Sequence, residues 1–286
     1  LGMMMGRETA IRMPFNDRRA LQGSLNDIAF CDMTNAIQHI RMVKSPAEQA
    51  KLTYICQLVS GVFADVPQWV KAGMPLDDLF RQFKIKALTA DVDDVSYLVG
   101  SAGPDGYQDI IAPPNSRPLA AGDVFMLDTG CVWDGYFSDF DRNFAIHHAS
   151  DEAHETHHRL YDATQAAIDI LRPGVTAADL FFAMDAILRP DHQGSSQHEQ
   201  ISAVKTGDDG VGRYGHGLGT QLTEPPSHTN WDQTVITAGM TLTLEPSIGY
   251  GNGLTMVAEE NLLVLEDRVV LLSTRASRDL PVIPAW

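Results

Sequence analysis

The chain has 286 residues, 44% of them hydrophobic and 20% charged, a composition typical of a globular protein that buries one large core. Its formal net charge of −16 argues against nucleic acid as a partner, because phosphates would repel such a surface, and against anionic lipid. No apolar run approaches the roughly 20 residues that cross a bilayer, and the first residues lack the apolar core of a signal peptide, so we expect a cytoplasmic protein with no membrane partner.

The first clear element is a helix that begins after Ser45. Serine can cap a helix, Pro46 fits its first turn, and Glu48 can reach back to complete a capping box. Apolar residues at helical spacing then continue to near Gly73. The later predicted elements are, in chain order, a helix at 76–87, strands at 95–99, 124–128 and 136–146, a helix that begins near 150 and breaks at 172–174, and strands at 240–248 and 254–265 that form a hairpin.

Two groups of residues recur in the same order in the two halves of the chain. Gly73, Asp78, Leu79 and Phe80 recur 101 positions later (73 to 174), as Gly174, Asp179, Leu180 and Phe181. Ala121-Gly122 and Leu127-Asp128 recur 117 positions later (121 to 238), as Ala238-Gly239 and Leu244-Glu245. The larger second displacement predicts an insertion, for which the loop-like stretch 190–215 is the natural place. We therefore predict two copies of one helix-helix-hairpin unit, related by a pseudo-two-fold axis.

In both halves an acidic residue ends an apolar strand, Asp128 in the first and Glu245 in the second. Each hairpin then returns a second acid, Asp139 and Glu259. A single acid in a strand is more often solvated or ion-paired, but four acids that converge would need cations, and two divalent ions would neutralise them. His216, within a glycine-rich segment, adds an imidazole. Oxygen-rich ligation with one nitrogen favours Mn, Co, Fe or Zn.

These residues resemble the pita-bread metallopeptidases, the family that includes methionine aminopeptidase, prolidase, aminopeptidase P and creatinase. The resemblance runs from Arg41-Met42-Val43-Lys44-Ser45-Pro46 to the end of the chain. The motifs that carry it are Leu127-Asp128-Thr129-Gly130 followed by Asp139, Gly215-His216-Gly217-Leu218-Gly219, Glu245-Pro246, and Glu259-Glu260-Asn261.

The resemblance implies a site, a fold and an assembly. Its metal ligands would be Asp128, Asp139, His216, Glu245 and Glu259, which would hold two divalent ions, manganese foremost, with Asp139 and Glu259 bridging them. The fold would be an α+β pita-bread (creatinase/aminopeptidase) fold, with duplicated helix-helix-hairpin units around a curved antiparallel sheet. A homodimer is also expected.

The resemblance, to the prolidase-creatinase branch, also predicts the domain organisation. Residues 1–40 are expected to be the remnant of an N-terminal domain of the creatinase/prolidase type, and residues 41–286 the pita-bread catalytic domain. The chain opens at Leu1 and not at methionine, which we interpret as a sign of a processed or truncated chain.

The sequence departs from the family pattern at two auxiliary histidine positions. Ile111 and Thr223 stand where the family peptidases usually place histidines that hold the substrate. His228 is close by in sequence and is a candidate to substitute, although a surface histidine is the simpler interpretation. Arg142 is a further candidate, either to steady the carboxylates or bind substrate, or to form a plain salt bridge to Asp141 or Glu260.

Three function classes follow. The first is a two-metal hydrolase similar to Xaa-Pro aminopeptidases or dipeptidases, in which a metal-bridging hydroxide attacks an amide carbon and Glu245 carries the proton to the leaving nitrogen. The second is a creatinase-like hydrolase or lyase acting on a small amide-like metabolite, which the loss of the auxiliary histidines favours. The third is an inactive binding module, which the presence of all five ligand types disfavours.

Two further patterns match known motifs. His154-Glu155-Thr156-His157-His158 matches the zincin pattern, but its polar neighbours favour a solvated start of a helix. The segment 210–215 spells the dinucleotide fingerprint, but no strand precedes it and no helix follows it. We interpret it as the approach to His216.

Overall fold

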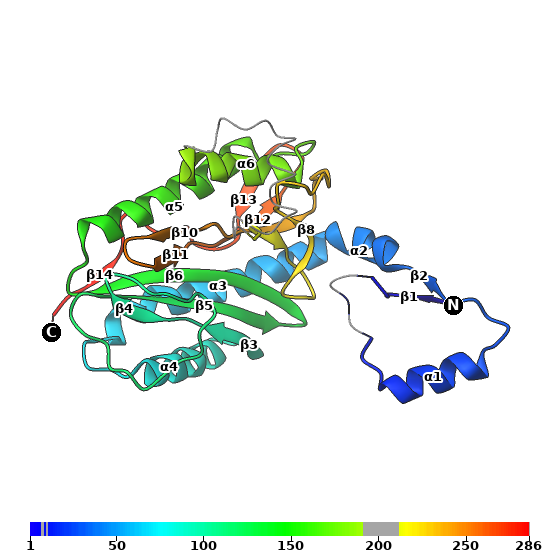
Figure 1. Cartoon of the computed structure of the whole chain (residues 1–286), viewed down its shortest axis with the longest axis horizontal. Helices are drawn as coiled ribbons and strands as arrows, with labels where there is room; N and C mark the ends of the chain where they lie inside the picture. The colour runs from blue at the N-terminus through cyan, green and yellow to red at the C-terminus, as the bar shows by residue number, and fades with distance from the viewer. Residues whose placement is uncertain (7–8, 10, 191–211, 286) are drawn as a thin grey trace.

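The computed structural model describes residues 1–6, 9, 11–190 and 212–285. Two pairs of helices lie on opposite sides of the β-strands, α3 and α4 on one side and α5 and α6 on the other (Figure 1). The fold is α+β with the helices outside, as predicted. The predicted insertion at 190–215 falls largely on residues 191–211, which lie outside the described residues.

The first half contains the elements that the sequence predicts. Ser45 caps the first helix, and the Ser45 and Glu48 side chains each accept the other residue's backbone N–H, so the capping box is confirmed. The predicted strand 124–128 continues for five further residues, to Trp133, and turns directly into its partner. The elements are α3 (Pro46–Trp69), α4 (Leu76–Thr89), β3 (Asp94–Val99), β4 (Ala102–Pro104), β5 (Asp123–Trp133) and β6 (Tyr136–Ile146).

The second half repeats this order, but both arms of its hairpin are interrupted. The breaks lie at 245–246 and 258–259, so Glu245 and Glu259 stand on backbone that leaves the strand ladder. The elements are α5 (Asp151–Ile170), α6 (Ala177–Leu188), β7 (His216–Gly217), β8 (Glu224–Ser227), β9 (Thr241–Leu244), β10 (Ser247–Tyr250), β11 (Leu254–Val257) and β12 (Glu260–Val264).

The strands form one large sheet for each half. In the first, β6 and β5 lie between β14 (Val282–Ile283) and β3, with β4 also paired to β5. The second has the order β13-β12-β9-β7-β8, where β13 is Val269–Leu271, and β10 pairs with β11 in a separate ribbon. Pairing is antiparallel within both large sheets except for β14, which runs parallel to β6.

Equivalent backbone contacts in the two halves support the duplication. The Gly73 N–H donates to the Leu119 carbonyl over 2.7 Å, and the Gly174 N–H donates to the Ile236 carbonyl over 2.9 Å. Both glycines have positive φ, +86° and +100°, a conformation that glycine adopts readily. The donors are displaced by 101 positions and the acceptors by 117 (119 to 236), the same two displacements that the sequence shows.

Side-chain alternation along β5 decides which residues face the second half. Phe125 and Leu127 pack in the core beneath α3 and α4, whereas Val124 and Met126 pack in the core that α5, α6 and the second-half strands share. Because successive side chains of a strand point to opposite faces, Asp128 lies on the face of Val124 and Met126. β5 therefore presents a carboxylate to the other half from its middle, and the expectation that Asp128 ends the strand is wrong because pairing with β6 continues to Trp133.

The described residues among the first 33 build no core of their own. They include β1 (Gly2–Met3), α1 (Phe15–Ser24) and β2 (Cys31–Asp32), and none of the described residues in this stretch is buried. They extend away from the body of the molecule (Figure 1). α2 (Thr34–Met42) joins them to α3 and contacts β8, so it crosses the boundary expected at residue 40, which stays a prediction. No described helix is long and apolar enough to cross a bilayer.

Candidate metal centre

Three predicted ligands, each from a different part of the fold, lie close together. Asp139 of β6, His216 of β7 and Glu259 between β11 and β12 offer ligand atoms that all lie within 4.8 Å of one another. The Nε2 of His216 is 3.4 Å from Asp139 Oδ2 and 3.8 Å from Glu245 Oε2. Residues more than 100 positions apart in the sequence therefore converge, as the duplication predicts.

The fourth carboxylate, Asp128, reaches the same group from β5. Burial raises its pKa well above the usual range, and the charges of Glu245 and Asp141 raise it further. The Tyr97 hydroxyl hydrogen-bonds to Asp128. Asp128 Oδ1 and Glu259 Oε1 are both buried without a hydrogen-bond partner among the described residues. Buried oxygens without donors need a cation or a proton, and their positions fit a metal site.

Burial and mutual repulsion raise the pKa of the other carboxylates too. For Asp139 and Glu259 the pKa lies well above the usual range because of burial, reinforced by neighbouring carboxylates. Burial raises the pKa of Glu245 to about 7, against the opposing effect of Arg213. Like charges at these distances cannot all ionise unaided. An oxygen-rich group of this kind fits two divalent cations.

His216 is held in the form that can bind a metal. Its backbone N–H donates to Thr243 Oγ1 over 3.1 Å, and its Nδ1 lies 2.9 Å from the carbonyl oxygen of Gly217. Nδ1 therefore carries the hydrogen, and the free lone pair of Nε2 faces the carboxylates. Burial lowers the His216 pKa to about 3, so the imidazole is neutral. Gly215 permits the close approach, because a Cβ there would lie 2.3 Å from the Thr243 carbonyl oxygen.

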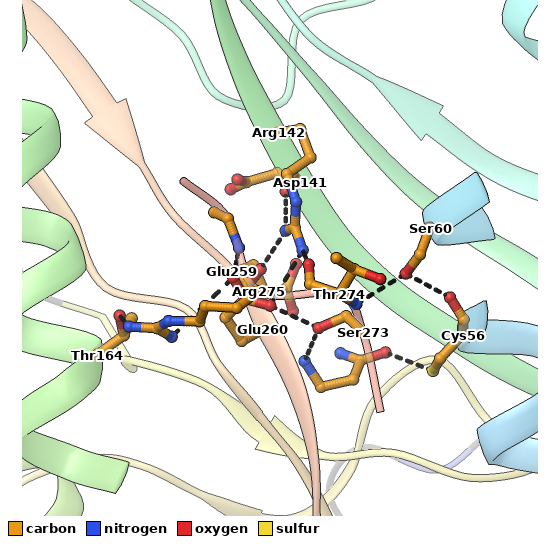
Figure 2. A network of polar contacts seen from close by, with 12 residues as sticks. Cys56, Ser60, Asp141, Arg142, Thr164, Glu259, Glu260, Ser273, Thr274 and Arg275 are labelled. Carbon is orange, nitrogen blue, oxygen red and sulfur yellow. Dashed lines mark hydrogen bonds and ion pairs between the residues drawn. The ribbon is translucent and has the colours of Figure 1, made fainter. Parts of the chain in front are cut away.

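Arg142 holds the backbone of the predicted ligand Glu259 and of Asp141 (Figure 2). Its guanidinium donates to the carbonyl oxygens of Glu259 (2.9 Å) and Asp141 (2.5 Å) and pairs with Glu260 at 3.0 Å. It also donates to the Thr274 carbonyl. The predicted salt bridge to Glu260 is confirmed. These contacts make Arg142 a positioning residue, because all of these acceptors are protein groups.

Asn261 joins the halves at the same level. Its side chain forms a reciprocal pair with the backbone of Asp139: Oδ1 accepts the Asp139 N–H over 2.9 Å, and Nδ2 donates to the Asp139 carbonyl. The Cys56 thiol of α3 also donates to Asn261 Oδ1. The sequence indicated Asn261 only as part of a motif, since a contact across 122 positions has no local signal.

Asp141 belongs to the site, although the sequence indicated it only as a salt-bridge candidate for Arg142. It is 1% exposed, its Oδ2 has no hydrogen-bond partner among the described residues, and burial raises its pKa to about 8. It accepts a backbone hydrogen bond from Glu259. Strand periodicity was the available signal, because Asp141 follows Asp139 by two residues and shares its face.

Comparisons with known proteins agree with this geometry. The profile of metallopeptidase family M24 matches residues 50–270. The chain belongs to metallopeptidase family M24. Membership implies divalent metal ions, and the carboxylate-histidine cluster is where this chain can hold them.

The chain is also similar in sequence to named dipeptidases. The chain is 26% identical over 256 residues to the probable dipeptidase PepE of Mycobacterium bovis, covering 88% of this chain and 63% of the relative. It is 27% identical over 272 residues to the Xaa-Pro dipeptidase of Lactobacillus delbrueckii subsp. lactis, covering 93% of this chain and 69% of the relative. The chain thus spans less than two thirds of the length of the mycobacterial dipeptidase.

Solved structures confirm the fold. The X-Pro aminopeptidase from Thermotoga maritima matches with a TM-score of 0.80 at 21% identity, over 95% of this chain and 73% of that chain. The dipeptidase PepE from Mycobacterium ulcerans matches with a TM-score of 0.80 at 26% identity, over 96% of this chain and 70% of that chain. The predicted pita-bread fold and the family resemblance are confirmed.

The residues at and near the positions that depart from the family pattern differ in exposure and contacts. Ile111 is 66% exposed on the surface. Thr223 accepts a hydrogen bond from Arg213. His228 is fully buried beside Gly215, so its interpretation as a surface histidine is wrong. The cause is the pairing of His216 with Ser227, which carries His228 into the interior, and burial lowers the His228 pKa to about 4.

The zincin-like pattern lies on α5. His158 pairs with Asp279 at 2.9 Å, as expected for a solvated turn. His157 is buried and its Nε2 lies 3.0 Å from the Ser277 carbonyl oxygen, so the solvated interpretation is wrong for this residue. Its side of the helix packs on the C-terminal segment, which the local pattern does not reveal. The 210–215 pattern lies partly outside the described residues, and its described part leads into His216 as predicted.

Proposed function

We propose that this chain is the catalytic part of a two-metal hydrolase that cleaves short peptides, with Xaa-Pro dipeptides as the first substrate class. The observation that carries the proposal is the convergence of Asp128, Asp139, Glu245 and Glu259 with a neutral His216, including buried oxygens without donors. The relatives named Xaa-Pro dipeptidase and dipeptidase PepE support a peptide substrate.

Two divalent ions would be held by Asp128, Asp139, His216, Glu245 and Glu259. Manganese is the first candidate, and cobalt, zinc and iron are alternatives. When bound, two such ions lower the pKa of water and polarise a carbonyl group. The protein supplies the position of the ligands, through Asn261 and Arg142 on the backbone and Gly217 on the imidazole.

Glu245 is the ligand best placed to move a proton. Its side chain is 25% exposed, compared with 7% for Asp139 and 3% for His216. A carboxylate that borders both the ligand group and solvent can take a proton from water and deliver it to a leaving nitrogen. His228, by contrast, is buried beside Gly215, and we assign it a packing role in place of the catalytic role considered from the sequence.

An activity screen tests this proposal. Protein loaded with Mn²⁺ or Co²⁺ is incubated with Ala-Pro, Ala-Ala and Ala-Pro-Ala, and released amino acids are quantified. We expect cleavage of Ala-Pro that EDTA abolishes and that Asp139→Asn removes. Metal-loaded, folded protein that cleaves none of the three would contradict the peptidase proposal.

A second candidate function is a creatinase-like hydrolase or lyase for a small amide-like metabolite. Thr223 favours it, because a threonine replaces a histidine that the family peptidases use on substrate. The same screen, extended to small amides and amidines, separates the two. An inactive binding module is the third possibility, and the complete ligand set argues against it.

The hydrolase proposal also includes two predictions about organisation: a domain boundary near residue 40 and a homodimer. Light scattering measures the oligomeric state.

A further inference from the structure

Arg213 is a cation at the edge of the metal centre with no assigned role. It lies three residues before His216, is half-buried, and its Nη2 donates to Thr223 Oγ1 over 3.2 Å. Within the described ranges, no carboxylate oxygen lies within 4.0 Å of its guanidinium, whereas Arg142 is ion-paired with Glu260. Arg213 therefore has N–H donors that can bind a further acceptor.

The backbone turns Arg213 toward the ligands. Its neighbour Tyr214 points the other way, where it is buried and stacks on Phe181 of α6 with ring centroids 4.7 Å apart. The Tyr214 carbonyl accepts the N–H of Glu245 over 3.0 Å, which places residue 213 beside this ligand. The charge of Arg213 accordingly lowers the pKa of both Asp139 and Glu245 against the effect of burial.

The partner of Arg213 belongs to a segment that crosses from the second half to the first. The Phe137 N–H of β6 donates to the Gly219 carbonyl over 2.9 Å. Three residues further on, Leu222 lies over Gly130 of β5, where an added Cβ would be 2.4 Å from Leu222 Cδ1 and 3.1 Å from Tyr97 Cβ. Leu222 and Tyr97 thus form an apolar wall next to Asp128, and Thr223 follows this wall directly.

We propose that Arg213, oriented by Thr223, binds the free carboxylate of a dipeptide whose scissile amide lies at the metal centre. A guanidinium matches a carboxylate with two parallel hydrogen bonds, a geometry that a point charge does not provide. Because Arg213 has no carboxylate within ion-pair distance among the described residues, its positive charge remains available for an anionic group of the substrate. The apolar wall beside it suits a proline ring.

This subsite makes the chain a dipeptidase in preference to an aminopeptidase for longer peptides. A substrate whose carboxylate is amidated, or displaced by a further residue, cannot form the paired hydrogen bonds, and the buried side of the guanidinium is then left without an acceptor. The inference takes its substrate class, dipeptides, from the proposed function. Binding of L-proline, a product of such a dipeptide, tests the Arg213 subsite without any cleavage.

The test compares L-proline with L-prolinamide by titration calorimetry on metal-loaded protein, together with the KM values for Ala-Pro and Ala-Pro amide. For wild type we expect about tenfold or more preference for the free carboxylate. Arg213→Met should abolish the preference, Arg213→Lys should retain part of it, and Thr223→Val should reduce it. Arg268→Met, which removes an exposed arginine paired only with Asp267 among the described residues, is the control and should keep the full preference.

Wild type without a preference, or Arg213→Met with the wild-type preference, overturns the proposal. If Arg213→Met does not fold or loses metal, Thr223→Val and Arg213→Lys decide, and an unchanged preference in both overturns it. Arg213-dependent proline binding without cleavage of any peptide would leave the subsite standing and refute the peptidase function. Cleavage of Ala-Pro and Ala-Pro amide with equal KM values would refute the subsite and leave the peptidase function standing.

Discussion

Asp128 on β5 and Asp141 on β6 are direct cross-strand partners, so two carboxylates face each other on the inner surface of one hairpin. Both are buried, and each has an oxygen without a hydrogen-bond partner in the described structure. Like charges opposite each other in a sheet destabilise it. The centre consequently holds five carboxylates, one more than the four carboxylates of the proposed ligand set. Its folding therefore depends on cations or protons.

Replacing Asp141 by Asn removes one of these charges and keeps the shape. In the metal-free protein at pH 8 we expect Asp141→Asn to raise the free energy of unfolding by about 1–2 kcal/mol, which for a chain of this size is about 2–4 °C per kcal/mol in melting temperature. Thermal melts with EDTA and with metal measure it. Asp141 would have no electrostatic role if the variant lowered both melting temperatures equally.

Metal binding should stabilise the chain by mass action. At a free metal concentration 100 times the Kd, the gain is about 2.7 kcal/mol, and EDTA should reverse it. Asp139→Asn should abolish the gain, because it removes a ligand while the backbone contacts of Asp139 with Asn261 remain. Asp134→Asn, at a side chain that is 59% exposed, is the matched control. Two metals bound by Asp139→Asn as tightly as by wild type, in a calorimetric titration, would refute the ligand assignment.

The stability of the metal-free protein should fall as the pH rises from 6.5 to 8. Glu245 and Asp141 have folded-state pKa values raised to about 7 and about 8, so the folded chain holds protons that the unfolded chain has released. The loss is up to about 1.4 kcal/mol per pH unit for each such proton.

Buried histidines act in the opposite direction at lower pH. His216, His157 and His228 have pKa values lowered to about 3, 4 and 4, so their contribution is lost only as the pH falls below about 6.5. Denaturant titrations at several pH values, with and without metal, measure both effects. A metal-free stability that rises between pH 6.5 and 8 would contradict the account.

A buried ion pair ties the segment before α3 to β8. Lys44 Nζ lies 3.0 Å from Glu224 Oε2, with side chains only 2% and 3% exposed, and Arg41 binds the other carboxylate oxygen. Glu224→Gln leaves the lysine charge buried without its partner, and we expect a loss of about 3–5 kcal/mol in chemical denaturation.

The exposed pair Lys51–Asp134 provides the comparison for this buried pair. Its side chains are 35% and 59% exposed, and Lys51→Met should cost no more than about 1 kcal/mol. Similar losses for Glu224→Gln and Lys51→Met would show that burial does not determine the strength of the Lys44–Glu224 pair.

The sequence by itself determined the features that depend on neighbours along the chain. Capping chemistry at Ser45, the apolar run before Asp128 and the turn between β10 and β11 act over a few residues, so the sequence could place the helices and the hairpin turn. It did not give the full length of β5 or the division of each arm of the second hairpin into two strands. The recurrence of Gly73 and its neighbours revealed the duplication. From the duplication followed the convergence of the acids at Asp128 and Glu245.

Only the tertiary structure decided which residues of neighbouring strands face each other and how deeply each side chain is buried. The pairing of Asp128 with Asp141 depends on the register between two strands, and the burial of His228 depends on how β8 packs beside β7. The contact of Arg213 with Thr223 depends on a loop that returns to the first half. Register, burial and loop return are set by the packing of distant segments, and this packing leaves no pattern in the local sequence.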